Sequence, residues 1–385
     1  MVIWQSPDWP QWRTDATQLQ APLAAARLAQ GRMLGMAQTL RLGDRGSLDA
    51  EAWASEALAT ARIEGEELEL HSVRASAARR LGLDAPATRR REERTEATLD
   101  VLEAAISRPE TPLSEELLCG WQAALFPTGR SGVRPIAVGR CWRDHGEPMQ
   151  IVTPRLGRPD IVHYEAPPSA RVPQDMAALI AWFNRPMPLD GLVRAAIAHI
   201  WFEAIHPFED GNGRIGRALA ERAIAQDQPA CARLFSLSEA LWQHRSAYYA
   251  ELQAVTGAAS LDATGWTVWF LCRLSEAFDA SLQRMQAAVD RHRFHREVDH
   301  RQVALTPGQR KALDRLFQAA PGEFVAGMST RAYVSLTGTS RATAWRELTE
   351  LVSLGLLQST GQGRGTRYHL ATSLLADLKQ PPAQA

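Results

Sequence analysis

Helical periodicity is the feature that most constrains the fold of this chain. Apolar residues recur three and four positions apart, as on one face of a helix, in several separate segments. The clearest are residues 23–40, 48–63, 117–126, 176–184, 192–205 and 266–278. The sequence therefore predicts a mostly α-helical protein. With 385 residues and 45% hydrophobic content, it can bury the cores of two or three domains.

Residues 130–168 are the exception to this pattern. Glycine and proline there separate short runs of β-branched residues and block any long helix. We interpret this stretch as a β-hairpin with long flanking loops.

Composition excludes several classes of protein. Lysine and arginine together number 43, as do aspartate and glutamate, so the chain as a whole is neither a polyanion binder nor an acidic solvating protein. The four cysteines lie far apart without a C-x-x-C pair, which argues against a zinc ribbon or a disulfide framework. We find no signal-peptide pattern and no apolar run long enough to span a bilayer. The sequence therefore predicts a cytoplasmic protein without a membrane partner.

The sequence changes in character after the charged stretch 291–301. Thr306 followed by Pro307 can begin a first helix, Ser329 can begin a second, and residues 338–340 make a turn into a third. Two further runs can then pair across the glycines of residues 361–365. These elements predict a winged helix-turn-helix domain over residues 301–385.

This C-terminal domain carries a local excess of positive charge. It has ten lysines and arginines against five aspartates and glutamates, and Trp345, Leu348 and Val352 are expected to form the apolar face of its third helix. The arginines expected to contact phosphates are Arg341, Arg346, Arg364 and Arg367. The charge favours DNA as a partner. A protein-docking role, or a homodimer, stays open.

The densest group of reactive side chains is HPFEDGNGRIGR, residues 206–217. Pro207 ends the helix predicted over 192–205, so His206 lies at its C-terminal edge, and a new helix begins directly after a glycine-rich turn. Such a turn presents several unpaired N–H groups to one anion. Arg214 and Arg217, three residues apart, can face the same anion, which favours a di- or triphosphate.

Two more side chains of this segment suit the chemistry of such a ligand. Asp210 supplies the hard oxygen ligand that a bridging Mg²⁺ prefers. His206 is a candidate general base, because the ordinary pKa of histidine lies near the working pH.

Three other interpretations of the same residues are weaker. An EF-hand loop starting at Asp210 requires glycine at its sixth position, where the chain has Ile215. Two E-x-x-H pairs, ending at His206 and His300, have the spacing of carboxylate di-iron bundles, but the arginine pair would place cations where the metals belong. A purely structural loop has little use for so many phosphate-binding residue types.

The segment resembles the signature of the Fic family, H-P-F-x-[DE]-G-N-G-R-x-x-R, without a departure at any defined position. The preceding hairpin resembles the flap of the family, and residues 174–184 and 246–252 resemble further parts of its core. The resemblance implies a Fic helical core over residues 95–290 with a β-hairpin flap, preceded by an N-terminal helical cap over residues 1–94.

The resemblance implies an activity as well. AMP would move from ATP to a Ser, Thr or Tyr hydroxyl of a target protein, with release of pyrophosphate. His206 would take the proton of the hydroxyl, and Asp210 would hold Mg²⁺. Contacts with ATP are implied for Asp210, Gly211, Asn212, Gly213, Arg214, Arg217, Tyr248, Ile151 and Val152. The flap at residues 149–153 would bind the target protein by strand addition.

A second motif, TARIEG at residues 60–65, resembles the inhibitory motif of the family, [ST]-x-x-x-E-[GN]. Thr60 and Glu64 are four residues apart on one helix face, and Gly65 is a natural helix end. The resemblance implies that Glu64 pairs with Arg217 and fills the γ-phosphate position, with Thr60 steadying it. The alternative is a solvated glutamate at a helix end.

We therefore predict an auto-inhibited protein adenylyltransferase. Two other functions stay open: a hydrolase that removes AMP at the same site, and a DNA-binding regulator whose Fic core senses nucleotide. The intact His206 argues against a pure sensor, because nucleotide binding does not require the base.

Overall fold

The computed structural model describes residues 2–40, 42–84, 92–139, 142–153, 161–186, 188–300, 302–318 and 327–371. Its internal contacts divide the chain into two compact units, Met1–Leu282 and Gln283–Ala385. Each unit buries its own set of apolar side chains. The domain limits expected from the sequence, 1–94, 95–290 and 301–385, stay predictions.

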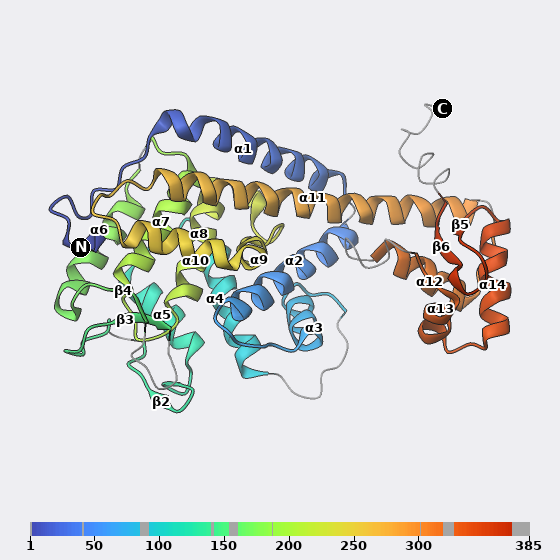
Figure 1. Cartoon of the computed structure of the whole chain (residues 1–385), viewed down its shortest axis with the longest axis horizontal. Helices are drawn as coiled ribbons and strands as arrows, with labels where there is room; N and C mark the ends of the chain where they lie inside the picture. Colours follow the sequence, from blue (N-terminus) through green and yellow to red (C-terminus); the bar gives the residue numbers. More distant parts are fainter. Residues whose placement is uncertain are drawn as a thin grey trace. The chain divides into compact units, whose positions relative to one another are not determined.

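The first unit is built almost entirely of helices, which confirms the mostly α-helical fold (Figure 1). Its helices are α1 (Ala16–Thr39), α2 (Leu42–Ile63), α3 (Leu70–Arg80), α4 (Glu93–Ser107), α5 (Glu115–Leu125), α6 (Val172–Asn184), α7 (Gly191–Ile205), α8 (Asn212–Asp227), α9 (Leu237–Gln243), α10 (Arg245–Thr256) and α11 (Thr264–His300), which continues into the second unit. Short 3-10 turns are η1 (Ile3–Gln5), η2 (Ser169–Arg171) and η3 (Pro229–Cys231). Each segment with helical periodicity coincides with one of these helices, apart from end residues.

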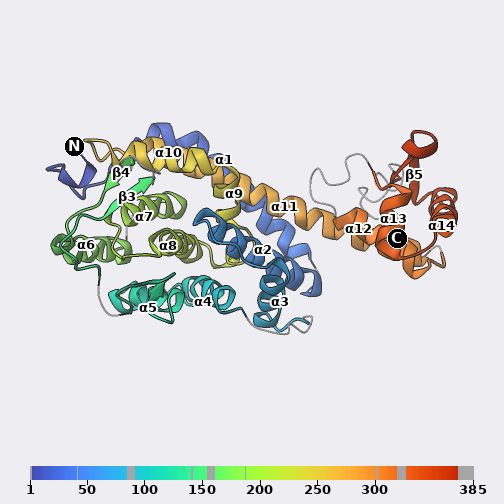
Figure 2. The same ribbon diagram turned by 60° about the horizontal axis from the view of Figure 1, so that its bottom comes forward.

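Helices α7 and α8 form the centre of the first unit. All residues of α7 except Arg194 are buried, as expected of a helix that is apolar on nearly every side. Asp190 caps α7 by accepting a hydrogen bond from Leu192 N at 2.9 Å. Helix α8 packs against α7, and α2, α4, α5 and α9 also contact α8 (Figure 2). The turn that joins α7 to α8, which carries the HPFEDGNG sequence, is thus anchored at both ends in the core.

Two short antiparallel hairpins lie between α5 and α6, where the sequence predicted one. Strand β1 (Arg130–Ser131) pairs with β2 (Arg134–Pro135), and β3 (Gln150–Thr153) pairs with β4 (Ile161–Glu165). The additional hairpin forms because Gly132, at φ 58°, allows a tight turn inside a stretch that was expected to be a loop. Residues 140–141 and 154–160 of the predicted flap lie outside the described residues.

The second unit contains the end of α11 followed by three helices and a strand pair. These are α12 (Pro307–Gln318), α13 (Thr330–Thr337), α14 (Arg341–Ser353), β5 (Leu357–Thr360), the turn η4 (Gly363–Gly365) and β6 (Arg367–Leu370), with β5 antiparallel to β6. The predicted helix starts are confirmed. The hydroxyls of Thr306, Ser329 and Ser340 each accept a hydrogen bond from a first-turn N–H at 3.1 Å.

The buried face of α14 differs from the predicted one. Ala344, Leu348 and Leu351 are buried, whereas Trp345 is 59% exposed. Trp345 lies about 100° round the helix from Ala344, so the core takes the small alanine and leaves the tryptophan on the solvent side. The predicted placement of Trp345 on the apolar face is therefore wrong.

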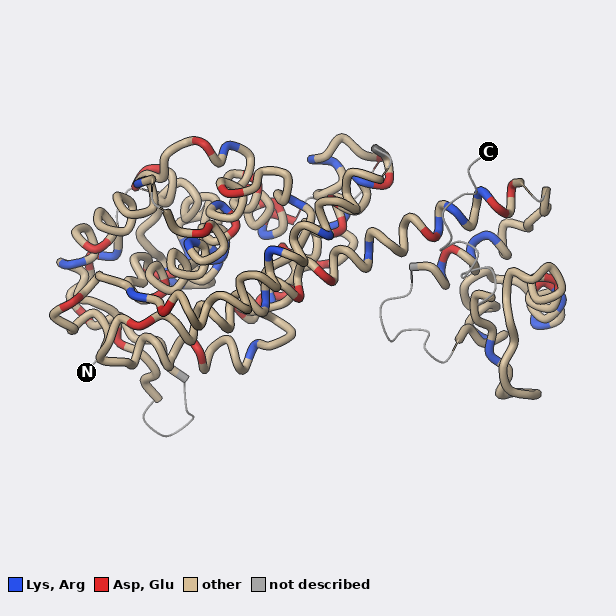
Figure 3. The backbone as a smooth tube through the Cα atoms, turned by 90° about the horizontal axis from the view of Figure 1, so that it is seen from above, with Lys and Arg blue, Asp and Glu red and all other residues tan. Residues whose placement is uncertain are grey.

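Charged residues of both signs are spread along the helices. Figure 3 shows lysine and arginine interspersed with aspartate and glutamate, in keeping with the equal totals of the two signs. Among the described residues, none of the helices combines the length and the apolar character needed to cross a membrane.

Candidate active site

His206 ends α7 and turns the chain toward α8. Its backbone is left-handed, with φ 51° and ψ 60°, which is uncommon for a residue with a β-carbon. The buried guanidinium of Arg143 donates to His206 O at 2.8 Å and to Ile205 O at 3.3 Å. The backbone N–H of Arg143 donates to Pro207 O at 2.9 Å. Arg143 thus fixes three successive carbonyl groups of this turn, although no sequence pattern had singled it out.

Asn212 and Gly211 shape the turn that follows. The buried Asn212 side chain accepts from Phe208 N at 2.9 Å and donates to Phe208 O at 2.8 Å, which closes the loop. Because this amide is already used, what Asn212 offers an anion is its backbone N–H. Gly211 has φ 89°, and a β-carbon there would lie 2.9 Å from the ring of Phe126. Glycine is therefore required at residue 211 by backbone angle and by space.

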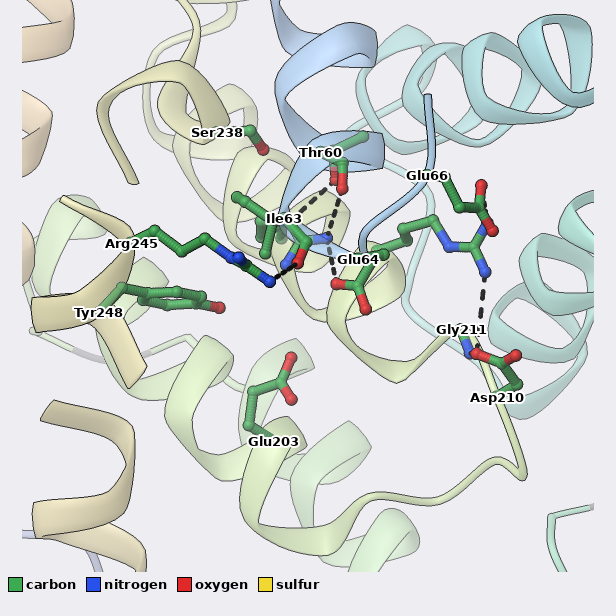
Figure 4. Close-up of polar contacts among 12 residues, drawn as sticks. Thr60, Ile63, Glu64, Glu66, Glu203, Asp210, Gly211, Ser238, Arg245 and Tyr248 are labelled. Atoms are coloured by element: carbon green, nitrogen blue, oxygen red, sulfur yellow. Dashed lines mark hydrogen bonds and ion pairs between the residues drawn. The ribbon is translucent and has the colours of Figure 1, made fainter. Parts of the chain in front are cut away.

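Two arginines near the start of α8, Arg214 and Arg217, contact carboxylates of the segment that directly follows α2 (Figure 4). Arg217 is 1% exposed, and it donates to Glu64 Oε1 at 2.7 Å and to Thr60 Oγ1 at 2.8 Å. The pair of Glu64 with Arg217 that the resemblance implies is therefore present. Arg214 Nη1 lies 3.3 Å from each carboxylate oxygen of Glu66, a residue that no sequence motif had indicated.

The Glu64 carboxylate lies against the N-terminus of α8. A β-carbon on Gly213 would lie 2.3 Å from Glu64 Oε1, so glycine at this position leaves room for the carboxylate. Burial alone would lower the pKa of Arg217, but the charges of Glu64, Tyr248 and Glu203 and the hydrogen bond to Glu64 together outweigh burial and raise that pKa above its ordinary value. The helix dipole also favours a negative charge at this end. An anionic ligand would therefore compete with Glu64 for the same space.

Asp210 ends the loop directly before α8. Its carboxylate accepts hydrogen bonds from the Ser131 hydroxyl and from Gly211 N, the latter at 2.6 Å. Arg214 Nη2 lies 3.8 Å away, and the Asp210 side chain is 38% exposed. In the part of the chain that the structure describes, no group of three or more His, Cys, Asp and Glu side chains could hold a metal ion alone. A single accessible carboxylate fits Mg²⁺, which keeps several waters and binds through few carboxylates plus substrate phosphates.

Burial sets the protonation of two side chains that face each other near the turn. Together with the nearby charge of Arg143, it lowers the pKa of His206 to about 4. It raises the pKa of Glu203 to about 8, although Arg217 opposes this shift. His206 Nδ1 and Glu203 Oε2 lie 3.9 Å apart. At neutral pH His206 is therefore neutral and able to accept a proton, and Glu203 is mostly protonated.

The other predicted nucleotide contacts lie on α10 and on the flap. Tyr248 is buried, and its hydroxyl is hydrogen-bonded to His199 Nε2 at 2.8 Å. The adjacent Tyr249 is 43% exposed and donates its hydroxyl to the last carbonyl of α2 at 2.9 Å. Ile151 and Val152 of β3 are 39% and 38% exposed. The roles of Tyr248, Ile151 and Val152 in nucleotide binding stay predictions.

The fold and the site together define a helical protein with two paired arginines near the start of its central helix and a neutral histidine before that helix. The Fic/DOC family model matches residues 112–224, and the model described as "Domain of unknown function (DUF4172)" matches residues 2–83. The chain belongs to the Fic/DOC family and carries an N-terminal DUF4172 domain.

Curated relatives match short parts of the chain. A probable protein adenylyltransferase of Aquifex aeolicus (strain VF5) is 34% identical over 64 residues, which are 17% of this chain and 20% of that protein. A protein adenylyltransferase of Caenorhabditis briggsae is 44% identical over 48 residues, which are 12% of this chain and 10% of that protein. The match thus spans a fifth or less of the length of these relatives.

Solved structures share the fold over more of the chain. A Fic family protein from Desulfovibrio desulfuricans G20 has a TM-score of 0.52 at 20% identity, covering 94% of this chain and 98% of that one. A Fic domain containing signaling protein from Bacteroides thetaiotaomicron VPI-5482 has a TM-score of 0.51 at 18% identity, covering 69% and 96%. At these identities the likeness establishes the fold and nothing finer.

Proposed function

We propose that this chain is a protein adenylyltransferase that Glu64 holds inactive. The observation that carries the proposal is the position of a neutral His206 at the end of α7, directly before the start of α8, where Arg214 and Arg217 lie. The two curated relatives are named as protein adenylyltransferases, which supports the same activity. ATP would be the nucleotide and a hydroxyl of a target protein the acceptor.

Each side chain of the site has a separate role in the proposed reaction. His206 accepts the proton of a Ser, Thr or Tyr hydroxyl while the oxygen of that hydroxyl bonds to the α-phosphorus of ATP. The bond from this phosphorus to the α–β bridging oxygen breaks, and pyrophosphate leaves with the electron pair. Arg214, Arg217 and the N–H groups of residues 211–213 stabilise the charge on the leaving group. Mg²⁺, held by Asp210, would neutralise part of the phosphate charge.

Glu64 would inhibit this reaction by occupying the γ-phosphate position. Its own placement is fixed by the end of α2, where Arg245 Nη2 and the Tyr249 hydroxyl donate to Ile63 O at 3.2 and 2.9 Å. Thr60 accepts from the same guanidinium that Glu64 binds, and so orients it. Release of the site requires α2 to move or the carboxylate to swing away.

The direct test is incubation of the full chain, and of its Glu64→Gly form, with a cell lysate and ATP labelled at the α-phosphate. We expect strong protein labelling with the variant and much weaker labelling with the unaltered chain. ATP labelled at the γ-phosphate is the control, because it should label nothing if AMP is the transferred group. Loss of label from an already adenylylated protein would favour AMP removal, and no labelling with either form would contradict the transferase.

The β3 strand supports a role of the flap in binding the target. Ile151 and Val152 lie on a two-stranded sheet whose only partner among the described residues is β4. An extended segment of the target could pair with the free edge and present its hydroxyl to His206. Backbone pairing of this kind tolerates many side chains, so the target is defined by an accessible extended segment that bears a hydroxyl.

The first prediction concerns the acid limit of the reaction. Because the pKa of His206 is lowered to about 4, its ring stays neutral as the pH falls through about 6.5, the ordinary value for histidine. The transfer rate should therefore fall by half only as the pH approaches that lowered value. The measurement is kcat of the Glu64→Gly form against pH, with folding checked by circular dichroism. A half-maximal rate near the ordinary value would contradict the burial of His206.

The second prediction concerns Asp210. Asp210→Ala should weaken ATP binding in the presence of Mg²⁺ and leave metal-free ATP binding nearly unchanged, because only the metal-dependent contact is lost. Isothermal titration with and without Mg²⁺ measures this difference. Glu209→Ala is the matched control, since it removes a neighbouring carboxylate that faces Arg134 at 3.5 Å. Equal affinities of variant and unaltered chain in Mg²⁺ would remove Asp210 as the metal ligand.

We also propose that residues 301–385 form a winged helix that binds duplex DNA. The order α12, α13, α14, β5 and β6 is that of the fold. Arg341 and Arg346 are exposed on α14 beside Trp345. The side chain of Arg364, also expected to contact phosphates, lies outside the described residues.

The third prediction follows from these arginines. If Arg341, Arg346, Arg364 and Arg367 all contact phosphates, DNA affinity should fall by about a hundredfold between about 50 and 200 mM salt. Fluorescence anisotropy with duplex DNA measures the slope of the logarithm of the affinity against the logarithm of the salt concentration. The Arg341→Ala/Arg346→Ala variant should reduce the size of this slope by about two. Affinity that does not depend on salt, or no binding at low salt, would favour the protein-docking alternative.

A further inference from the structure

Glu64 and Glu66 leave the end of α2 in a defined geometry. Gly65 N donates to Arg62 O at 3.0 Å and Glu66 N donates to Ala61 O at 2.9 Å, with Gly65 at φ 77°. This pair of bonds is a Schellman motif, in which Gly65 is the left-handed residue just past the helix. The motif fixes the direction of the chain on both sides of Gly65. The two glutamates are therefore placed by the backbone rather than by flexible loop geometry.

Each of these glutamates contacts a different arginine of α8. Glu64 Oε1 lies 2.7 Å from Arg217, and both oxygens of Glu66 lie 3.3 Å from Arg214 Nη1. Figure 4 shows Glu64 and Glu66 in the same region, with Thr60 beside Glu64 and with Asp210 and Gly211 near Glu66. The side chains of Glu64 and Glu66 are 30% and 29% exposed, whereas Arg217 and Arg214 are 1% and 7% exposed. Both arginines are thus largely removed from water, and the carboxylates of one short segment neutralise their positive charges.

The two arginines lie at different depths along α8. Arg214 belongs to the first turn and has Asp210 at 3.8 Å, whereas Arg217 lies nearly one turn further along the helix. A phosphate chain that enters beside Asp210 therefore meets Arg214 before Arg217. A diphosphate would therefore contact Arg214 alone, and a triphosphate would contact both Arg214 and Arg217.

We propose that Glu66 is a second inhibitory residue, so that Glu64 and Glu66 form a two-pronged block in which each carboxylate occupies one arginine of the phosphate site. A nucleoside triphosphate must displace both carboxylates, and a nucleoside diphosphate must displace only Glu66. This inference rests on the proposed nucleotide site and deepens it, because it assigns a nucleotide-specific effect to each acid. The left-handed backbone of Gly65 holds both carboxylates in place.

The test measures the binding of Mg-ATP and Mg-ADP to the full chain by isothermal titration. Glu66→Gln should tighten both nucleotides by about three- to fivefold, because its arginine pair is longer and partly solvated. Glu64→Gln should tighten ATP by about tenfold and change ADP by less than twofold. The double variant should combine the two effects on ATP. Glu67→Gln is the matched control, since Glu67 is exposed in the same segment and its replacement removes the same charge.

The role of the left-handed turn at Gly65 can be tested by a separate variant. Gly65→Ala places a β-carbon in open space but at a left-handed φ, and should displace both prongs and tighten ATP as the double variant does. Gly82→Ala is the control, because Gly82 ends α3 with the same motif at φ 69° and also has open space. Similar melting temperatures for these two variants would show that folding is equally affected. Only Gly65→Ala should then alter nucleotide affinity.

The outcomes separate this inference from the proposed activity. If Glu66→Gln binds both nucleotides as Glu67→Gln does, the second prong is lost, even where Glu64→Gly raises AMP transfer. If Glu64→Gln tightens ADP as much as ATP, the assignment of one acid to each phosphate is wrong. If the affinities shift as expected but no variant transfers AMP, the two-pronged block stands and the transferase proposal fails. If no variant binds either nucleotide, both proposals fail.

Discussion

Replacing Glu64 with glycine is expected to raise the rate at which the protein labels itself from ATP by about ten- to a hundredfold. The contact that this removes joins a buried guanidinium to a carboxylate oxygen at 2.7 Å. A charge-assisted contact of this kind contributes ~1.5 to 3 kcal/mol. A γ-phosphate has to displace it before ATP can bind productively. The measurement is the initial rate of AMP incorporation, with the α-phosphate labelled and Mg²⁺ present.

Arg217→Ala distinguishes release of the block from simple loss of the ion pair. This variant also frees Glu64, but it deletes the cation that the γ-phosphate needs and leaves Glu203 and Glu221 without the positive charge that opposes their raised pKa values. We therefore expect no activation, and a lower melting temperature. If Arg217→Ala labelled itself as fast as Glu64→Gly, or if Glu64→Gly left the rate unchanged, inhibition through this pair would be refuted.

The parts of the site that the sequence predicted are those set by local chain geometry. Pro207 stops α7 and the turn at Gly211 starts α8, so the position of His206 and the location of Arg214 and Arg217 in the first two turns of α8 follow from adjacent residues. The Thr60 and Glu64 pair was also predictable, because their helical spacing places both on one face. Its partner in α8 could be named only through the resemblance to a known family, since the contact spans 153 residues.

The residues that the sequence did not predict act over long separations or at unusual spacings. Arg143 binds His206 O across 63 residues, and no periodic pattern marks it. Glu66 lies two residues after Glu64, a spacing that would point them apart on a helix, and only the reversal at Gly65 brings both toward α8. A signal was present in the letters EGE, since glycine after a helix permits such a reversal. Its meaning depended on where the arginines lie.

The fold beyond the site was predicted well where apolar spacing was strong and less well where it was sparse. Helix α11 was expected over 266–278 but runs to His300, because Phe294 and Val298, four residues apart, keep one buried face through a highly charged stretch. Composition had suggested a boundary there. On α14, by contrast, the prediction relied on the large apolar side chain of Trp345 and was wrong, because Ala344 is buried in the core and Trp345 is exposed.

Replacing His206 is expected to abolish AMP transfer while leaving ATP binding nearly intact. A general base accounts for about a hundred- to ten-thousandfold in rate, and His206 acts on the incoming hydroxyl rather than on a phosphate. The change is best made in the Glu64→Gly form, where the starting rate is high enough to show a large loss. The measurements are the rate of AMP incorporation and the affinity for Mg-ATP.

The choice of substitute for His206 decides how clean this result is. The residue has φ 51°, and asparagine adopts such a left-handed backbone more readily than alanine. His206→Asn therefore keeps the turn that Arg143 binds through backbone carbonyls, yet its amide cannot accept the proton. We expect His206→Asn and His206→Ala to be equally inactive, and His206→Asn to retain the melting temperature of its parent more closely. Labelling by His206→Asn at a rate comparable to the parent would show that another group, or water, takes the proton.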